Sequence, residues 1–199
     1  QYYNDGVFSW LRRAARHGCP IGAVSTGSLL LARAGLLDGY KCTIHWELLP
    51  DFVEEFPKLE ISRALYCIDR DRLTCAGGTA AMDMMLAAIA QRHGRKLATD
   101  VADQFLHSRI RLPEETQRMA VQWRYGVTDE RLARAINFME QNVENVIAPQ
   151  VFANAVGISY RQLERLFRQS FEQSPARFYL DLRLKHARAL LAETTDSIQ

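Results

Sequence analysis

Long hydrophobic runs are missing from this sequence. The longest candidate, residues 80–90, is interrupted by Asp83 and is shorter than the roughly 18 apolar residues that a membrane-spanning helix needs. No segment resembles a signal peptide. We therefore expect no membrane partner and a cytoplasmic protein, with residues 80–90 in a buried helix.

Cysteines are few and widely spaced. The four, Cys19, Cys42, Cys67 and Cys75, form no C-x-x-C pair and no His/Cys spacing typical of zinc ligands. This pattern predicts buried, reduced thiols. We expect no metal site and no cofactor.

The remaining composition is that of an ordinary globular protein, with 48% apolar and 24% charged residues among 199. Positive charge is concentrated locally: residues 159–188 hold seven basic and three acidic side chains, whereas the whole chain has a net charge of +2. Such a run is often only a solvated helical face. It is also the electrostatic pattern of a small nucleic-acid-binding unit.

Two kinds of sequence pattern divide the chain. Residues 1–112 alternate short apolar runs with amphipathic segments, which is typical of an α/β domain. We expect helices at residues 8–16, 28–35 and 79–94, and strands at 20–24, 59–69 and 72–78. Residues 113–127 read as a linker. Residues 128–199 are predicted to be all helical, with Thr128 as the first N-cap and a stripe of apolar side chains at Leu132, Ile136, Met139 and Val143.

Residues 149–171 have the pattern of a helix-turn-helix. A helix from Pro149 is expected to bury Val151, Phe152 and Val156, and Gly157 permits the reversal of the backbone. Ser159 and Gln162 form a predicted capping box for the second helix, whose inner face is Leu163, Leu166 and Phe167. The expected outward, DNA-binding residues are Ser159, Tyr160, Arg161, Gln162, Arg165 and Arg168.

Four motifs follow one another here: A-x-x-x-G-I-S, R-Q-L-x-R-L-F, S-P-x-x-F-Y and R-L-x-x-A-R-x-L-L. In this order and spacing they resemble the AraC family of bacterial transcription regulators. The resemblance implies double-stranded DNA as a partner. It also implies a second helix-turn-helix that begins near residues 195–198, so we expect the sequence to hold one complete unit and the start of another.

A different motif, GAVSTG at residues 22–27, follows an apolar strand and precedes a helix. This is the pattern of a nucleophile elbow with Ser25 at its tip. It supports an alternative function, a serine hydrolase or amidase in which His45 or His17 acts as the base. No acid is placed by spacing to orient His45.

Residues 23–49 and 75–94 resemble the glutamine-amidotransferase-like (ThiJ/PfpI) domain found at the N-terminus of one AraC subgroup. That superfamily commonly has cysteine where this chain has Ser25. The resemblance implies a partial flavodoxin-like α/β fold, the C-terminal part of a sensor domain that has lost catalysis. Its implied ligand pocket comprises Ser25, Thr26, His45, Gly77, Gly78 and Thr79.

Together the two resemblances imply a ligand-responsive regulator rather than an enzyme. The expected protein is a homodimeric activator of amino-acid or quaternary-amine metabolism genes, responding to a small nitrogenous effector. Tyr40 and Trp46 are candidate cation–π surfaces for such an effector.

Overall fold

The computed structural model describes residues 4–193 and divides the chain into two compact units, separated between Arg118 and Met119. The segment expected as a linker, residues 113–127, is shared between them. The Pro113 carbonyl accepts a bond from the Leu65 amide of the first unit, whereas Val121–Tyr125 form a helix of the second. The expected start of a second helix-turn-helix, at residues 195–198, lies outside the described residues.

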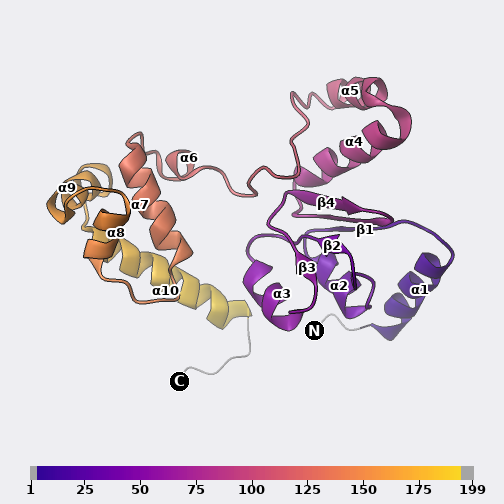
Figure 1. Ribbon diagram of the computed structural model, residues 1–199, viewed down its shortest axis with the longest axis horizontal. Helices are drawn as coiled ribbons and strands as arrows, with labels where there is room; N and C mark the ends of the chain where they lie inside the picture. The colour runs from indigo at the N-terminus through magenta and orange to yellow at the C-terminus, as the bar shows by residue number, and fades with distance from the viewer. Residues whose placement is uncertain (1–3, 194–199) are drawn as a thin grey trace. The chain divides into compact units, whose positions relative to one another are not determined.

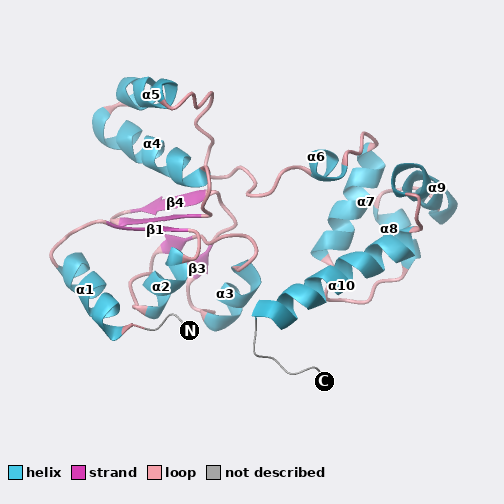
Figure 2. Ribbon diagram, turned by 180° about the vertical axis from the view of Figure 1, so that it is seen from behind, coloured by secondary structure: helices cyan, strands magenta, loops and turns pink. Residues whose placement is uncertain are grey.

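The first unit has a three-layer arrangement, with α4 on one face of a mixed sheet and α1 and α2 on the other (Figures 1 and 2). Strand β1 pairs in parallel with β5, which pairs antiparallel with β4, while β2 and β3 form a separate parallel pair. The elements are α1 (Asp5–Arg16), β1 (Ile21–Val24), α2 (Gly27–Arg33), β2 (Lys41–Cys42), α3 (Leu49–Glu55), β3 (Glu60–Ile61), β4 (Tyr66–Asp69), β5 (Arg72–Cys75), α4 (Ala80–His93) and α5 (Arg95–Gln104).

Burial explains the two central elements of this unit. Strand β1 alternates, with Ile21 and Ala23 buried and Gly22 and Val24 exposed, as expected of a strand with one face on the core. Helix α4 buries Met84 and Leu86 and ends at Gly94, whose φ of +91° suits only glycine. Both elements were predicted from the sequence and are confirmed.

One predicted strand is wrong. Residues 59–69 form two strands that pair with different partners, β3 with β2 and β4 with β5. The backbone changes sheets between them because the Ser62 amide bonds to Cys42 O at 2.8 Å, whereas the Leu65 amide bonds to Pro113 O at 2.8 Å. Helices α3 and α5 were not predicted at all.

The second unit is entirely helical over its described residues and has its own core. Its elements are α6 (Val121–Tyr125), α7 (Glu130–Gln141), α8 (Pro149–Ala155), α9 (Tyr160–Phe171) and α10 (Pro175–Glu193). The predicted stripe of α7 is buried at Leu132, Ile136 and Met139. The N-cap prediction was wrong by one residue, because the side chain of Asp129, not that of Thr128, accepts bonds from the amides of Arg131 and Leu132.

Helices α8 and α9 form the predicted helix-turn-helix around Gly157, which has a φ of +74°. Phe152 and Val156 are buried as expected, but Val151 is 42% exposed, so its predicted burial is wrong. The reason is geometric: residues four apart lie on one helix face, and Val151 lies about 100° from Phe152 around the axis.

The described residues contain no helix that is both long and apolar enough to cross a membrane. Of the cysteines, Cys42, Cys67 and Cys75 are buried, and burial raises the pKa of Cys42 to about 12 and that of Cys67 to about 11. Cys19 is exposed, so the prediction of burial fails there.

Candidate nucleic-acid interface and effector crevice

The N-terminus of α9 is fixed by a capping box. Ser159 Oγ accepts a hydrogen bond from the backbone amide of Gln162 at 3.3 Å, and the side-chain oxygen Oε1 of Gln162 accepts one from the backbone amide of Ser159 at 3.0 Å. The predicted capping box is therefore confirmed. Because the carbonyl oxygen of Gln162 is engaged in the cap, its side chain offers chiefly the NH₂ group to a partner outside the protein.

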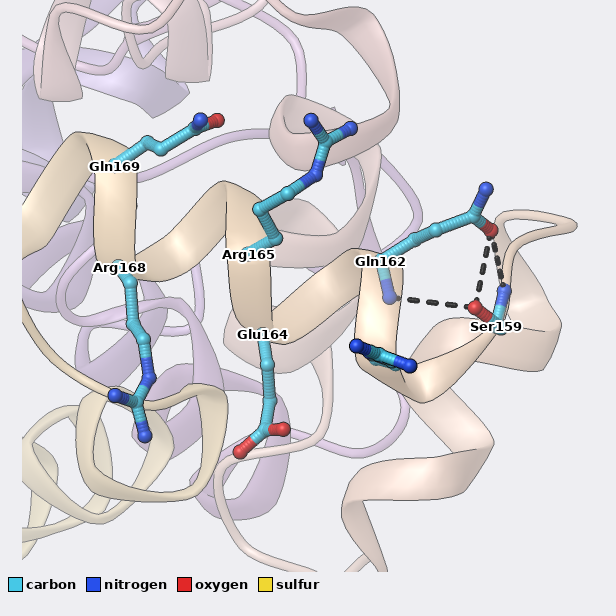
Figure 3. A pocket seen from close by; sticks show the side chains of 7 residues that line it. Ser159, Gln162, Glu164, Arg165, Arg168 and Gln169 are labelled. Carbon is cyan, nitrogen blue, oxygen red and sulfur yellow. Dashed lines mark hydrogen bonds between the residues drawn. The ribbon is translucent and has the colours of Figure 1, made fainter.

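Helix α9 separates an apolar inner face from a polar outer one. Leu163, Leu166 and Phe167 are buried, as predicted. On the outer side Gln162, Arg165 and Gln169 extend in one direction and Glu164 and Arg168 in another (Figure 3). A surface groove runs along these side chains, lined by Ser159, Arg161, Gln162, Glu164, Arg165, Arg168 and Gln169.

Gln169 was not among the outward residues expected from the sequence. It lies seven residues after Gln162, which is the spacing that returns a side chain to the same helix face two turns later. Tyr160 was expected on the exposed outer face, but it is more buried than that. Its ring is half-buried against the core of the unit, and burial raises the pKa of its hydroxyl. Tyr160 therefore contributes mainly to packing.

The arginines of α9 lack the acidic partners that three other arginines of the second unit have, namely Arg124, Arg131 and Arg177. Arg124 pairs with Glu140 at 2.6 Å, and Arg131 pairs with Asp129 at 2.7 Å. Among the described residues, no ion pair or hydrogen bond engages the side chains of Arg161, Arg165 and Arg168, which are all exposed. Their charge remains available to an external anion.

The tip of the predicted elbow has the backbone of a strained turn. Ser25 has a φ of +55°, rare for a residue other than glycine, and its amide bonds to Cys75 O at 2.9 Å at the end of β5. Gly77 approaches so closely that a Cβ atom there would lie 2.8 Å from that of Ser25. The structure thus brings Ser25 and Gly77 together at the carboxyl ends of β1 and β5, where open α/β sheets bind ligands.

The other expected crevice residues lie on neighbouring loops. Thr26 and Gly78 are exposed, and Thr79 occupies the N-cap position of α4 without capping it. Instead, Thr79 Oγ1 accepts a bond from Arg111 at 2.6 Å. This contact links the crevice to a segment that the sequence did not associate with it.

His45 is half-buried, and its Nδ1 lies 3.5 Å from Glu47 Oε2. The sequence spacing placed no acid to orient His45, but a tight turn brings the side chain of Glu47, two positions later, back to the ring. His17 bonds through Nδ1 to Arg13 O of its own helix at 2.7 Å. Among the described residues, no hydrogen bond joins Ser25 to a histidine.

A buried polar network forms the floor behind the elbow. Ser28 Oγ donates to Thr43 O at 2.7 Å, and the Thr43 amide donates to Thr74 Oγ1 at 2.9 Å. All three residues are buried. A fully bonded network of this kind rigidifies the sheet end on which the crevice is built. This network was not predicted, since isolated Ser and Thr residues form no recognisable pattern in the sequence.

Both units are similar to known protein families. Residues 2–91 match the DJ-1/PfpI family, and residues 152–199 match a helix-turn-helix domain family. The chain joins a DJ-1/PfpI unit to an AraC-type helix-turn-helix unit. The predicted fold class, a flavodoxin-like α/β domain followed by an all-helical domain with a helix-turn-helix, is confirmed.

Among curated proteins, the HTH-type transcriptional regulator CdhR of Pseudomonas aeruginosa is 45% identical over 192 residues, which cover 96% of this chain and 57% of that protein. GbdR of the same species, also an HTH-type transcriptional regulator, is 46% identical over 190 residues, 96% of this chain and 52% of its own. The chain thus spans a little over half the length of the curated relatives it matches. Among solved structures, an AraC family transcriptional regulator from Pseudomonas putida aligns with 33% identity over 53% of this chain and 57% of its own, with a TM-score of 0.49.

The aromatic residues expected to receive a cation in the DJ-1/PfpI unit already have partners. The guanidinium groups of Arg70 and Arg72 lie 3.8 and 4.8 Å from the centre of the Tyr40 ring, and that of Arg118 lies 4.3 Å from the Trp46 ring. A ligand cation would have to displace these arginines. In the part of the chain that the structure describes, no group of His, Cys, Asp and Glu side chains could hold a metal ion.

Proposed function

We propose that this protein is a transcription regulator that binds DNA through α9 and binds a small effector in the crevice of its DJ-1/PfpI unit. The observation that carries the proposal is the outer face of α9, where three exposed arginines have no acidic partner in the described part of the chain. The opposite face of the helix is buried, and its N-terminus is capped. The regulators CdhR and GbdR, similar over nearly the whole chain, support it.

The geometry of α9 suggests a role for each side chain. A recognition helix enters the major groove with its N-terminal residues nearest the base edges. Arg161 and Arg165 lie in the first turns and suit bidentate bonds to guanine, whereas Arg168 lies one turn further along and suits a phosphate. Gln162 acts as a donor, since its oxygen serves the cap.

The effector is proposed to bind at Ser25, Thr26, His45 and the turn of Gly77, Gly78 and Thr79. We propose a small nitrogenous metabolite and genes of amino-acid or quaternary-amine metabolism as the regulated class, with activation as the mode. A homodimer is proposed because one helix-turn-helix binds DNA weakly by itself. A regulator of chromosomal genes acts in the cytoplasm, so the proposal includes that location.

The alternative function, a serine hydrolase, is favoured by one observation, the strained φ of Ser25, which nucleophile elbows share. A serine hydroxyl requires a base hydrogen-bonded to it, and the contacts of His45 and His17 lie elsewhere. A fluorophosphonate probe distinguishes the two functions. The regulator proposal predicts no stoichiometric labelling of Ser25, and labelling that Ser25→Ala abolishes would favour the hydrolase.

The proposed function is tested by fluorescence anisotropy of a labelled random 30-base-pair duplex titrated with the protein. Binding should weaken steeply as salt rises, because phosphate contacts release counterions. Replacing Arg161, Arg165 and Arg168 together by alanine should reduce the affinity by at least tenfold. The matched control replaces Arg13, Arg16 and Arg92 of the DJ-1/PfpI unit, which are exposed and have no acidic partner among the described residues. Equal losses in both triple variants would contradict the assignment of α9.

A further inference from the structure

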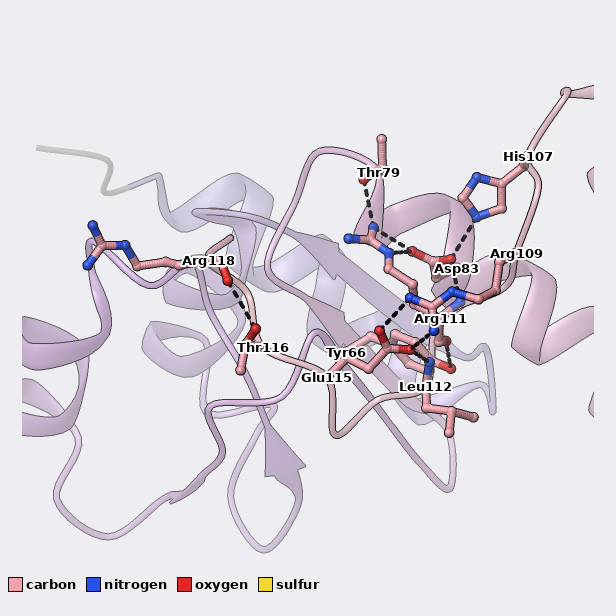
Figure 4. A network of polar contacts seen from close by, with 10 residues as sticks. All are labelled: Tyr66, Thr79, Asp83, His107, Arg109, Arg111, Leu112, Glu115, Thr116 and Arg118. Atoms are coloured by element: carbon pink, nitrogen blue, oxygen red, sulfur yellow. Dashed lines mark hydrogen bonds and ion pairs between the residues drawn. The ribbon is translucent and has the colours of Figure 1, made fainter. Parts of the chain in front are cut away.

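The stretch between α5 and the helix-turn-helix unit lies along the DJ-1/PfpI unit and has no regular secondary structure (Figure 4). We call residues 107–118 the strap. Because it has neither helix nor strand bonds, the strap stays in place through individual contacts with the unit beneath it. Two of these contacts are anchors: Arg111 near one end and Gln117 near the other.

The first anchor is a buried ion pair. Asp83 of α4 is fully buried and accepts bonds from the Arg111 amide at 2.9 Å, from Arg111 Nε at 2.8 Å and from His107 Nε2 at 2.8 Å. Burial alone disfavours the charged carboxylate, but these bonds outweigh it and lower the pKa of Asp83 below its ordinary value. Tyr66 adds a bond to Arg111 O at 3.1 Å. This end of the strap is firmly held.

Arg111 also contacts the crevice directly. Its terminal nitrogen donates to Thr79 Oγ1 at 2.6 Å, and Thr79 follows the Gly77–Gly78 turn that packs against Ser25. The Thr79 hydroxyl makes no bond to the first turn of α4, so Arg111 is the partner that holds it. One side chain therefore joins the edge of the crevice to the strap.

The second anchor is incompletely bonded. The Gln117 side-chain nitrogen has three acceptors within 3.2 Å, namely Thr43 Oγ1, Ile44 O and Ala64 O. Gln117 Oε1 is buried and finds no donor among the described residues. A buried acceptor without a partner is unfavourable, so Gln117 holds this end of the strap less completely than Arg111 holds the other. Ile44 directly precedes His45, so this anchor also ends beside the crevice.

We propose that the strap couples effector binding to the helix-turn-helix unit. An effector that bonds the Thr79 hydroxyl, or shifts the Gly77–Thr79 turn, competes with Arg111 and loosens the strap. Once released, the strap becomes part of the flexible chain that connects the helix-turn-helix unit to the DJ-1/PfpI unit, so this connection becomes longer. A longer connection changes the effective concentration with which two helix-turn-helix units bind paired DNA sites. This consequence rests on the proposed function, whereas the release itself does not.

Limited trypsin digestion tests the release, because Arg109, Arg111 and Arg118 are cleavage sites within the strap that require an open chain. Thr79→Val keeps the shape of the side chain but removes the acceptor. It should speed cleavage at these sites about tenfold, the factor expected for one hydrogen bond to a charged group. Thr99→Val is the control, since the Thr99 hydroxyl donates to Arg95 O within α5 and, in the part of the chain that the structure describes, makes no contact with the strap.

Strap cleavage at the same rate in Thr79→Val, Thr99→Val and the unmodified protein would overturn the proposal. If Thr79→Val also lowers the melting temperature, Arg111→Lys replaces it, because lysine can pair with Asp83 but has no second nitrogen for Thr79. Arg111→Lys should open the strap to a similar degree, and strap cleavage as slow as in the unmodified protein would equally overturn the proposal.

Occupancy of the crevice can be imitated chemically. In the double variant Cys19→Ser, Ser25→Cys, iodoacetamide should modify position 25, since the remaining cysteines are buried. The adduct beside Gly77 should speed strap cleavage severalfold relative to the unmodified double variant. Unchanged cleavage after complete modification would show that the crevice and the strap are not coupled. Neither cleavage assay uses DNA. A negative result would therefore contradict the release of the strap without contradicting the proposed DNA-binding function.

Discussion

A Cβ atom on Gly77 would lie 2.8 Å from the Cβ atom of Ser25, closer than side chains approach one another. Gly77 has a φ of +100° and Ser25 a φ of +55°, so both residues have backbone conformations that L side chains rarely adopt. The strain at Ser25 persists only because the surrounding structure imposes it. Gly77 belongs to those surroundings, because it packs directly against Ser25.

Gly77→Ala should therefore destabilise the DJ-1/PfpI unit more than Gly78→Ala. Gly78 also has a positive φ, of +54°, but nothing lies within 4 Å of its missing Cβ. The overpacked contact at Gly77 should cost about 1–3 kcal/mol beyond the loss in Gly78→Ala. Urea denaturation measures both. Equal losses would show that Ser25 and its turn move apart without cost.

Gln162→Glu should separate capping from DNA binding. Glutamate fills the same position in a capping box, so the urea midpoint should stay within error of the original. The added negative charge on the outer face of α9 should nevertheless weaken DNA binding. Ser159→Ala is the contrasting variant, because it loses the cap and should cost about 0.5–2 kcal/mol of stability. A Gln162→Glu protein with unchanged DNA affinity would place this side chain away from the interface.

Leu163→Ala should act through folding. Leu163 is fully buried in the core of the helix-turn-helix unit, and the cavity should cost about 2–5 kcal/mol. Val151→Ala provides the comparison, because Val151 is 42% exposed and should lose well under half as much. Thermal and urea unfolding give the two values. Similar losses would mean that α8 packs with its Val151 face inward.

Asp129 should make the helix-turn-helix unit sensitive to acid. The bond from the Arg131 side chain, together with bonds from backbone amides, lowers the pKa of Asp129 from 3.8 to about 2. Because the pKa of Asp129 is lower in the folded state than in the unfolded state, the ionised carboxylate stabilises the fold at pH values above the unfolded-state pKa of 3.8. This stabilisation is lost as the pH falls from about 4 to about 2. Asp129→Asn keeps a cap and does not titrate. The stability difference between the two proteins should shrink over that pH range, and a constant difference would contradict the assignment.

Local patterns in the sequence predicted the parts of this structure that depend on local chemistry. The capping box of Ser159 and Gln162, the buried face of α9 and the glycine that ends α4 each depend on residues within one or two helical turns. The resemblance to the two families could be recognised for the same reason, because it depended on short motifs that follow one another in a fixed order along the sequence. These features could be predicted because their partners are close in sequence.

The missed features depend on partners far apart in the sequence. Residues 59–69 were predicted as one strand because their apolar pattern is continuous, but the bond from Leu65 to Pro113, nearly 50 residues away, divides them. The contact between Arg111 and Thr79 spans 32 residues. The part of the strap that begins at Pro113 was expected to be a linker, since polar residues and a proline look the same in a free linker and in a bound strap.

The central claim, that α9 reads base sequence, is tested most directly by competition between a selected operator and a scrambled duplex at two salt concentrations. The full-length protein is used as the unmodified form and with Arg161→Ala, Arg165→Ala or Arg168→Ala. Loss of Arg161 or Arg165 should reduce the preference for the operator, by about 1–3 kcal/mol for each bidentate contact. Loss of Arg168 should weaken binding to both duplexes and lower the salt slope by about one. If the Arg161 and Arg165 variants keep the original preference while binding both duplexes more weakly, α9 contacts only the DNA backbone and the account is wrong.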